Sequence, residues 1–330
     1  MGPPGSKNRL PATVEAFYPQ VLPGLCGTPR PVAHRRQLTL RNLATENSKR
    51  LVIIMPAHNE GKYLRACLES FASQERQPDE LLIVDDNSTD RTAQIAGEFA
   101  RAHDWIRLAG RTSGSGHQPG PKVVECFEYG LSQTEQPYDF IGKFDADILL
   151  PPDYFRKVLE AFEAHPGLGL CGGHLYVERN GKTVYEPIAG PGHVRGPVKL
   201  YSKACFRTIG GLRPSIGWDM ADALLARYHG FGVRTLPELK VIHMRPTGFA
   251  YSARNARLQG QALYQLRYGV GISLLSSLKM AWKRRNPLLP FQHLSGYLRA
   301  FFSGSGRLLT RQEGAFARNW RWREIRRKLS

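Results

Sequence analysis

The sequence predicts an α/β protein with a mostly parallel central sheet, helices on both faces of it, and a basic helical appendage at the C-terminal end. Short apolar runs rich in β-branched residues alternate with segments of helical periodicity, which is the pattern of parallel strands joined by helical crossovers. Acidic or polar residues directly follow each of the first three runs. Positive charge is concentrated in the last part of the chain, where the periodicity changes.

The first predicted strand covers residues 51–55, an apolar run bounded by Arg50 and Pro56. A helix follows, because apolar residues recur with helical spacing at Leu64, Cys67, Leu68 and Phe71. The residues between them, 56–60, form the predicted loop after the first strand.

The second predicted strand covers residues 81–84 and ends at Asp85 and Asp86. The polar run 87–90 supplies turn and helix-cap residues, and the apolar spacing of residues 93–99 predicts the next helix.

The third apolar segment, residues 139–144, is followed by Asp145 and Asp147 and then by a helix with an apolar face from Pro152 to Phe162. In a strand, residues i and i+2 point the same way. Where the strand gives way to a turn, both carboxylates can therefore converge on one hard cation, and such a cation can hold a diphosphate.

In sheets of this kind ligands bind beyond the carboxyl ends of the strands. Residues 56–60, Asp85–Asp86 and Asp145–Asp147 all fall at such ends. Three polar strand ends facing one crevice are hard to explain by folding needs, so we interpret them as a ligand site rather than as solvated loops.

Composition fits an enzyme with one large domain and an appendage, since 330 residues with 42% hydrophobic content can build a core. The five cysteines are at least 34 residues apart without a C-x-x-C pair, which suits a reducing compartment and predicts neither a zinc site nor a disulfide framework. No segment has the pattern of a signal peptide or a membrane span, so we expect a cytoplasmic protein.

Charge divides the chain into three predicted parts. Residues 1–48 are basic and rich in Pro, Gly and Arg, and we expect them to be irregular. Residues 49–249 form the predicted folded domain and are almost neutral. Residues 250–330 form a predicted basic amphipathic helical tail, which accounts for most of the net charge of +18.

Four segments resemble the inverting glycosyltransferases of family 2, which have the GT-A fold. They are VIIMPAHNE, LLIVDDNSTDRT, FDADILLPPDYF and IGGLRPSIGWDMADALLARYHGFGVRTLPELKVIHMRPTG, in the family's order and spacing. The resemblance runs from about Arg50 to Gly248. It implies transfer of a sugar from a nucleotide-diphosphate sugar to a hydroxyl acceptor, with inversion and with a divalent cation, Mg²⁺ or Mn²⁺.

This resemblance implies that Asp147 binds the metal, while Asp145 shares it or reaches the ribose or the donor sugar. His243 is either a third ligand or a hydrogen-bonded histidine at a strand end. Glu60 is expected either to hold the donor nucleotide or to be an acid in the first turn of a helix, where the helix dipole favours it. The residues expected to hold the donor nucleotide are Pro56, Ala57, His58, Asn59, Glu60, Asp86, Lys122 and Asp145.

The attacking hydroxyl needs a base on the face opposite the leaving group, and the candidates are Asp219 and Asp222. In similar enzymes the base is the Asp of a Glu-Asp pair, eleven residues before a Gly, which is Asp219 when counted from Gly230. Trp218 stands where that Glu would be, which departs from the family pattern. Asp219 could also cap the helix that follows, and Asp222, one turn on, could orient or replace it.

On the acceptor side we place His193, Arg195, Lys199 and Trp218. The first three lie around two glycines in a basic loop that could meet an acceptor diphosphate, or that could be a surface turn.

The tail is too interrupted to span a bilayer, since Gly269 and Gly271 break its apolar stretch. Apolar and aromatic residues mixed with Arg and Lys fit helices that lie in the headgroup region of an anionic membrane. We therefore expect a protein peripheral on the inner face of the membrane, with a lipid-linked or polysaccharide acceptor. The alternative is helices that pack on the folded domain. The aromatic residues that could contact lipid are Trp282, Phe291, Phe301, Phe302, Trp320 and Trp322.

Rival functions fit less well. The turn PAHNEG lacks the G-x-G-x-x-G of a nicotinamide dehydrogenase, and the Gly-rich, Arg-containing loop of a sugar nucleotidyltransferase is also missing. The remaining alternative is a membrane- or RNA-binding protein with a degenerate, non-catalytic nucleotide-sugar-binding fold. It would explain the basic tails but not the ordered acids, and we expect no specific nucleic-acid partner.

Overall fold

The computed structural model describes residues 49–112, 120–134, 137–188, 190–245 and 253–327. The predicted irregular segment 1–48 and the predicted domain boundary at residues 249–250 lie outside these residues.

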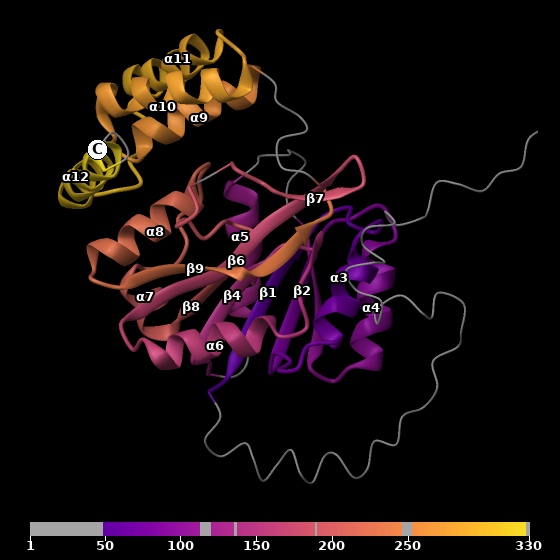
Figure 1. Cartoon of the computed structure of the whole chain (residues 1–330). Coiled ribbons are helices and arrows are strands. Elements are labelled where there is room, and N and C mark those ends of the chain that lie inside the picture. The colour runs from indigo at the N-terminus through magenta and orange to yellow at the C-terminus, as the bar shows by residue number, and fades with distance from the viewer. Residues whose placement is uncertain (1–48, 113–119, 135–136, 189, 246–252, 328–330) are drawn as a thin grey trace, which may run out of the picture.

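A single nine-stranded sheet in the order β3-β2-β1-β4-β8-β6-β9-β5, with β7 beside β6, forms the centre of the described chain (Figure 1). Its first half is parallel, since β1 pairs with β2 and β4, and β2 pairs with β3. Strands β1, β2 and β4 contain the three predicted apolar segments, whereas β3 was not predicted. These strands are β1 (Leu51–Ala57), β2 (Glu80–Asp86), β3 (Ile106–Arg111) and β4 (Phe140–Phe144).

The second half of the sheet is mixed. Strand β8 runs antiparallel to β4 and β6, whereas β6 and β9 run parallel. The short β5 pairs antiparallel with the end of β9 and so places the segment after Asp147 beside His243. The strands are β5 (Ile148–Leu149), β6 (Leu168–Arg179), β7 (Lys182–Tyr185), β8 (Val198–Ser202) and β9 (Gly232–His243).

Helices cover both faces of the sheet because side chains of β1 alternate between two apolar cores. Leu51 and Ile53 pack with α3, α4 and α6 on one face, while Val52 and Ile54 pack with α5, α7 and α8 on the other. The predicted α/β class with helices on both faces is confirmed. The helices are α3 (Leu64–Ala72), α4 (Thr92–Ala102), α5 (Pro121–Ser132), α6 (Tyr154–Ala164), α7 (Lys203–Thr208) and α8 (Trp218–Tyr228).

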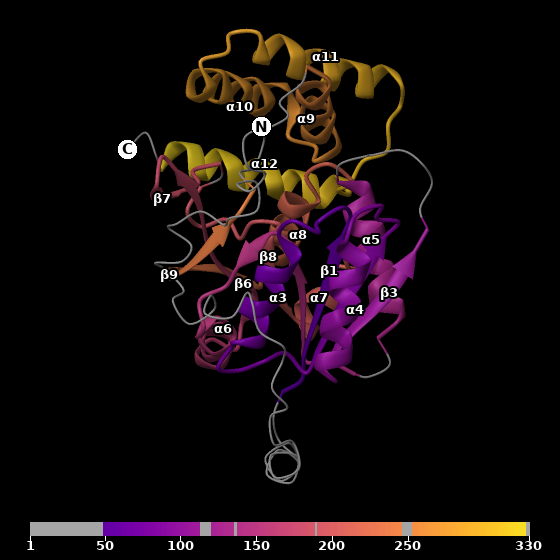
Figure 2. The same ribbon diagram turned by 90° about the vertical axis from the view of Figure 1, so that its right-hand side faces the viewer.

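Four further helices follow the sheet, and three of them form a layer above it with α12 between (Figure 2). The last helix packs on α8: Phe316 meets the ring of Tyr228, and Trp320 lies under the guanidinium of Arg227. Trp320, which we expected to contact lipid, is therefore partly covered by the folded domain. The helices are α9 (Ala253–Gln265), α10 (Gly269–Arg284), α11 (Leu289–Phe302) and α12 (Arg311–Arg326).

Helices α9 and α11 cross in direct backbone contact at two glycines. A Cβ on Gly260 would lie 1.9 Å from the carbonyl oxygen of His293, and one on Gly296 would lie 1.9 Å from that of Arg257. Within the part of the chain that the structure describes, no helix is both long and apolar enough to cross a membrane.

Candidate active site

The loop after β1 is fastened to the loop after β2. The backbone N–H of Asn59 donates to Ser88 Oγ at 2.9 Å, and the N–H of Thr89 donates to Asn59 Oδ1, also at 2.9 Å. The N–H of Glu60 donates to Thr92 Oγ1 at 2.7 Å, and His58 Nδ1 lies 2.7 Å from the carbonyl oxygen of Asp86. Because Asn59 takes φ 54°, the loop turns sharply against its neighbour. Two predicted donor-binding segments thus form one unit at the carboxyl edge of the sheet.

Two of the predicted loop residues belong to the strand instead. Pro56 and Ala57 are the last residues of β1, paired in register with Val84 and Asp85. Their positions were misjudged because Pro56 was taken as the end of the strand, yet its missing N–H does not prevent pairing here. The side chain of Ala57 is buried, whereas Pro56 is partly exposed.

Asp86 and Lys122 flank this unit. Asp86 is buried and lies 3.6 Å from the Arg111 guanidinium. Lys122 stands in the first turn of α5 with Pro121 before it, as the sequence predicts. The turn before α5 is held close to the segment before α8, since a Cβ on Gly120 would lie 2.6 Å from the carbonyl oxygen of Ser215.

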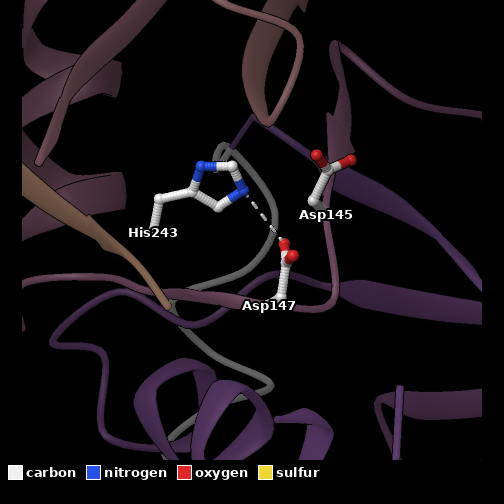
Figure 3. Close-up of side chains that lie close together, drawn as sticks. All are labelled: Asp145, Asp147 and His243. Carbon is white, nitrogen blue, oxygen red and sulfur yellow. Dashed lines mark ion pairs between the residues drawn. The ribbon is translucent and has the colours of Figure 1, made fainter. Parts of the chain in front are cut away.

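Asp145, Asp147 and His243 converge where β4 gives way to β5 and where β9 ends (Figure 3). One potential ligand atom from each residue lies within 4.8 Å of the others. His243 Nε2 is 3.4 Å from Asp147 Oδ1, which is buried and accepts no hydrogen bond from a described residue. The two segments, almost a hundred residues apart in the chain, are joined by the β5–β9 pairing.

Basic side chains surround the cluster. Arg245, two residues after His243, contacts Asp147 Oδ2 at 2.9 Å and also pairs with Glu60. Lys143 is buried and pairs with Asp145. These contacts balance the carboxylates and tie the first loop to the third strand end.

A second carboxylate supports His243 from behind. Glu186 Oε2 lies 3.6 Å from His243 Nδ1, and it also pairs with the buried Arg195. A carboxylate on the far nitrogen fixes the orientation and tautomer of a metal-binding histidine. Arg195 was predicted to face the acceptor. It is instead buried and forms an ion pair with Glu186, the carboxylate that contacts His243.

These surroundings shift the pKa values in opposite directions. Burial alone would lower the pKa of His243, but the carboxylates of Asp147 and Glu186 raise it to about 9. Burial would raise the pKa of Asp147, yet His243 and Arg245 outweigh this and lower it. For Glu60, burial and the nearby charge of Asp147 raise the pKa to about 7 against the pull of Arg245.

The cluster fits a divalent cation such as Mg²⁺ or Mn²⁺. Carboxylate oxygens are suitable ligands for both ions, and an imidazole nitrogen beside them favours Mn²⁺, the softer of the two. Asp147 Oδ1 and Glu60 Oε2 are buried oxygens without a hydrogen bond from the described residues, and a cation would satisfy at least the first of them.

Asp219 lies in the first turn of α8 and faces His193. His193 Nε2 is 3.5 Å from Asp219 Oδ2, and the Asp219 side chain is 33% exposed. Burial alone would raise the pKa of Asp219, but His193, Lys199 and Arg195 lower it overall. The helix is capped by Gly217, with φ 92°, so the alternative role of Asp219 as the N-cap is wrong.

Asp222 has a different environment, although it lies one turn on in the same helix. Both of its oxygens lie 2.7 Å from Lys199 Nζ, Tyr201 also donates to it, and all three side chains are buried. The prediction that Lys199 meets the acceptor is wrong, because its ammonium group is buried in the core and pairs with Asp222. Trp218 is mostly buried too, with Lys143 Nζ and Lys199 Nζ each 5.4 Å from its ring centroid.

Three further residues of the site were not found from the sequence. Glu186 lies in no segment singled out from the sequence, whereas Arg245 and Lys143 each stand two residues from a predicted site residue and had no role predicted for them. Glu186 and Arg245 act through partners distant in the chain, and Lys143 acts through Asp145, two residues on. Lys143 carried one signal, since a lysine inside the apolar run 139–144 needs a buried partner. For Glu60, the alternative role as a helix first-turn acid is wrong: α3 begins at Leu64 without a first-turn acid, and the Glu60 carboxylate pairs with Arg245.

Comparison with known proteins places these residues in context. A family model described as Glycosyl transferase family 2 matches residues 52–212. The beta-monoglucosyldiacylglycerol synthase of Synechocystis sp. is 32% identical over 263 residues, which cover 72% of this chain and 53% of that protein. Chondroitin synthase of Escherichia coli is 27% identical over 161 residues, which cover 48% of this chain and 22% of that protein. The chain thus spans about half the length of these curated relatives, or less.

A solved structure shares the fold. The mannosyltransferase PcManGT from Pyrobaculum calidifontis, in complex with GDP-Man and Mn2+, superposes with a TM-score of 0.52 at 16% identity. The match covers 80% of this chain and 77% of that chain, so it includes most of the sheet and its helices.

Proposed function

The chain belongs to glycosyltransferase family 2, and on this premise we propose that it transfers a sugar from a nucleotide-diphosphate sugar to a hydroxyl of a lipid-linked or glycan acceptor, with inversion. Its sheet has the GT-A fold predicted from the sequence. One observation carries the proposal: Asp145, Asp147 and His243 converge at the sheet edge that also holds the fastened loops after β1 and β2.

Asp147, Asp145 and His243 would hold the divalent cation. When bound, that cation neutralises the charge that develops on the departing nucleotide diphosphate. The solved relative in fold was obtained with GDP-Man and Mn2+, which supports a nucleotide-sugar donor and a divalent cation here. The residues of the chain set its position: Glu186 orients His243, and Lys143 holds Asp145.

The nucleotide would lie against the fastened loops. Asp86 and the 58–60 segment offer a carboxylate and backbone groups at a fixed geometry, which is what recognition of a base and ribose needs. Lys122, at the start of α5, would meet phosphate, which is supported by the preference of helix N-termini for anions.

Asp219 would take the proton from the attacking hydroxyl. It is partly exposed and ionised, whereas Asp222 is buried under Lys199. His193 stabilises the charge of Asp219 and orients its carboxylate. One base and one displacement leave no covalent intermediate, so the product has inverted configuration.

The place of action is proposed from the chemistry of the donor. Nucleotide sugars are made in the cytoplasm, and the four described cysteines are free and buried, in accord with a reducing compartment. We place the enzyme at the cytoplasmic face of a membrane, where a lipid-linked acceptor for surface polysaccharide or glycolipid is accessible.

A panel of nucleotide sugars tests the proposal. Purified full-length protein with Mn²⁺ should release nucleotide from one donor class, and Asp147→Ala should remove this release. Release from no donor, with tight nucleotide binding retained, would favour the non-catalytic alternative.

A further inference from the structure

Helices α10 and α11 leave their large apolar side chains in solvent. Twelve such side chains are exposed among the described residues, and only Trp322 lies outside the segment between Gly269 and Phe302. Trp282 is 87% exposed, Phe302 80% and Phe291 71%. We call these side chains the α10–α11 surface: Val270, Leu274, Leu275, Leu278, Trp282, Leu288, Phe291, Leu294, Leu298, Phe301 and Phe302.

The spacing of these residues places them on one side of each helix. On α10 the members of the surface stand at i, i+4, i+5, i+8 and i+12 from Val270 to Trp282, and on α11 they stand at i, i+3, i+7, i+10 and i+11 from Phe291 to Phe302. The opposite sides are used for packing: Ile272 and Tyr297 are buried in the core shared with α8. The α10–α11 surface is therefore a second apolar face that the described residues leave uncovered.

The base of the surface is rigid. Because α9 and α11 touch backbone to backbone at Gly260 and Gly296, α11 is held without help from its outer side chains. A cavity of about 80 Å³ lies between α10 and α11, lined by Leu274 and Leu294 among others, and it gives an apolar chain a recess at this surface.

The charge around the surface has one sign. No Asp or Glu occurs between Glu238 and Glu313, while Lys279, Lys283, Arg285 and Arg299 are exposed on or beside α10 and α11. An apolar stripe flanked by Lys and Arg is the composition of helices that lie in the headgroup layer of an anionic bilayer. Each basic residue near such a surface contributes favourably, roughly fivefold in partitioning.

Other occupants match this chemistry less well. A second copy of the chain would bring the same basic residues face to face without an acid to pair them. RNA would meet the charges but would leave Leu274, Leu275 and Leu278 in water. At 16 residues, α10 is shorter than the roughly 20 residues that a bilayer span needs.

We propose that the α10–α11 surface docks in the headgroup layer of an anionic lipid bilayer, with both helices lying along the membrane plane. This inference deepens the proposed function. The lipid-linked nature of the acceptor rests on that function, whereas the docking does not. The docking itself is carried by the exposed side chains and the charge.

Helices α9 and α10, which pack with α11, contact the acceptor side of the site. Ala262 of α9 lies 3.5 Å from the position of a Cβ on Gly217, the residue that caps the helix carrying Asp219. At the other end, Lys283 Nζ donates to the carbonyl oxygen of Pro187 at 3.4 Å, next to Glu186. Docking of the α10–α11 surface would hold Asp219 at a fixed distance from the lipid surface, where a lipid-linked hydroxyl arrives.

Co-sedimentation of the full-length protein with vesicles tests the docking. The wild type should pellet with phosphatidylcholine/phosphatidylglycerol vesicles at low salt and less at 0.5 M salt, since exposed charges are screened. The variant Trp282→Ser/Phe291→Ser/Phe302→Ser should bind at least about tenfold more weakly at both salt concentrations, because exposed aromatics supply the salt-independent part. Circular dichroism should show all variants folded, as the three rings are exposed.

Two charge variants separate the surface from net charge. Lys279→Glu/Arg299→Glu should weaken binding to the anionic vesicles at least about tenfold. Arg101→Glu/Arg207→Glu makes the same change in net charge on α4 and α7, at exposed positions of the folded domain, and should bind almost as the wild type does.

The proposal is overturned if the wild type does not bind anionic vesicles, or if the triple serine variant binds them as tightly as the wild type. It is also overturned if sedimentation velocity shows a dimer that the triple serine variant abolishes. Nucleotide release from the donor in water, without vesicles, is measured in parallel. Release without vesicle binding defeats the docking alone, and vesicle binding without release from any donor defeats the proposed function alone.

Discussion

Lys199 Nζ lies 2.7 Å from both carboxylate oxygens of Asp222, and neither side chain reaches solvent. Burial raises the pKa of Asp222 more than Lys199 and Tyr201 lower it, so the carboxylate depends on these two partners for its charge. Asp219 is one turn away in the same helix and remains partly exposed. The two candidate bases therefore have separate roles, one in folding and one at the site.

Asp222→Ala should destabilise the protein by about 3–5 kcal/mol, because it leaves the ammonium group of Lys199 buried and uncompensated. Urea unfolding followed by circular dichroism measures this. The double variant Lys199→Met/Asp222→Leu should recover most of the loss, since it removes both charges at similar volume. A stable Asp222→Ala protein without turnover would instead make Asp222 the base.

Asp219→Asn should lower turnover by roughly 10²–10⁴-fold, the usual worth of a positioned proton acceptor. Donor affinity and the free energy of unfolding should change little, because Asp219 is partly exposed and faces His193 rather than the cation cluster. Steady-state kinetics and nucleotide titration check both. The anomeric configuration of the product is a further test, and retention would contradict a single displacement.

Asp147→Ala should remove divalent-dependent turnover and leave the chain folded. The reason is that Asp147 Oδ1 is the buried oxygen that faces His243 at 3.4 Å. EDTA should have the same effect on the wild type, reversed by added Mn²⁺. Asp153→Ala, which removes a carboxylate at the N-cap of α6, is the matched control and should keep activity. If neither EDTA nor Asp147→Ala changes turnover, the metal assignment is wrong.

Cation binding should become tighter as the pH rises. The folded protein raises the pKa of His243 to about 9, and a ligand imidazole must be neutral, so binding at lower pH must first remove a proton. Below pH 9 the apparent affinity for Mn²⁺ should fall by about tenfold per pH unit, if one proton is released. Calorimetry in buffers of different ionisation enthalpy counts that proton. His243→Gln should flatten the dependence, and an unchanged slope in this variant would remove His243 from the ligand set.

Arg245→Gln should tighten divalent binding by up to about fivefold. The guanidinium contacts Asp147 and Glu60 and must leave Asp147 when a cation takes its place. The effect is modest because Arg245 is half-exposed, and such ion pairs contribute about 0.2–1 kcal/mol. Mn²⁺ titration of the two proteins decides the matter. Weaker binding in the variant would mean that Arg245 supports the site instead of competing for it.

The early strands and the donor loops were predictable because their signals are local. The apolar run 51–55, the acids after residues 81–84 and the pair Asp145–Asp147 each mark a strand end within a few residues. Parallel strands joined by helices then bring such ends to one edge whatever the details of packing. The boundary at Pro56 failed because strand pairing in the fold outweighed the local signal of a proline.

The supporting residues of the site were not predictable in the same way. Glu60 and Arg245 are 185 residues apart in the chain, and Lys199 and Asp222 are 23 apart, so no spacing rule joins them. The β5–β9 pairing and the burial of α8 against β8 bring these charges together. Local periodicity and turn chemistry depend on neighbouring residues, and they specified the early strands and the acidic edge, whereas the strand order is known only from the fold. Which carboxylate stays ionised in solvent and which is locked in the core depends on desolvation and on partners from distant strands, and these exist only once the chain is packed.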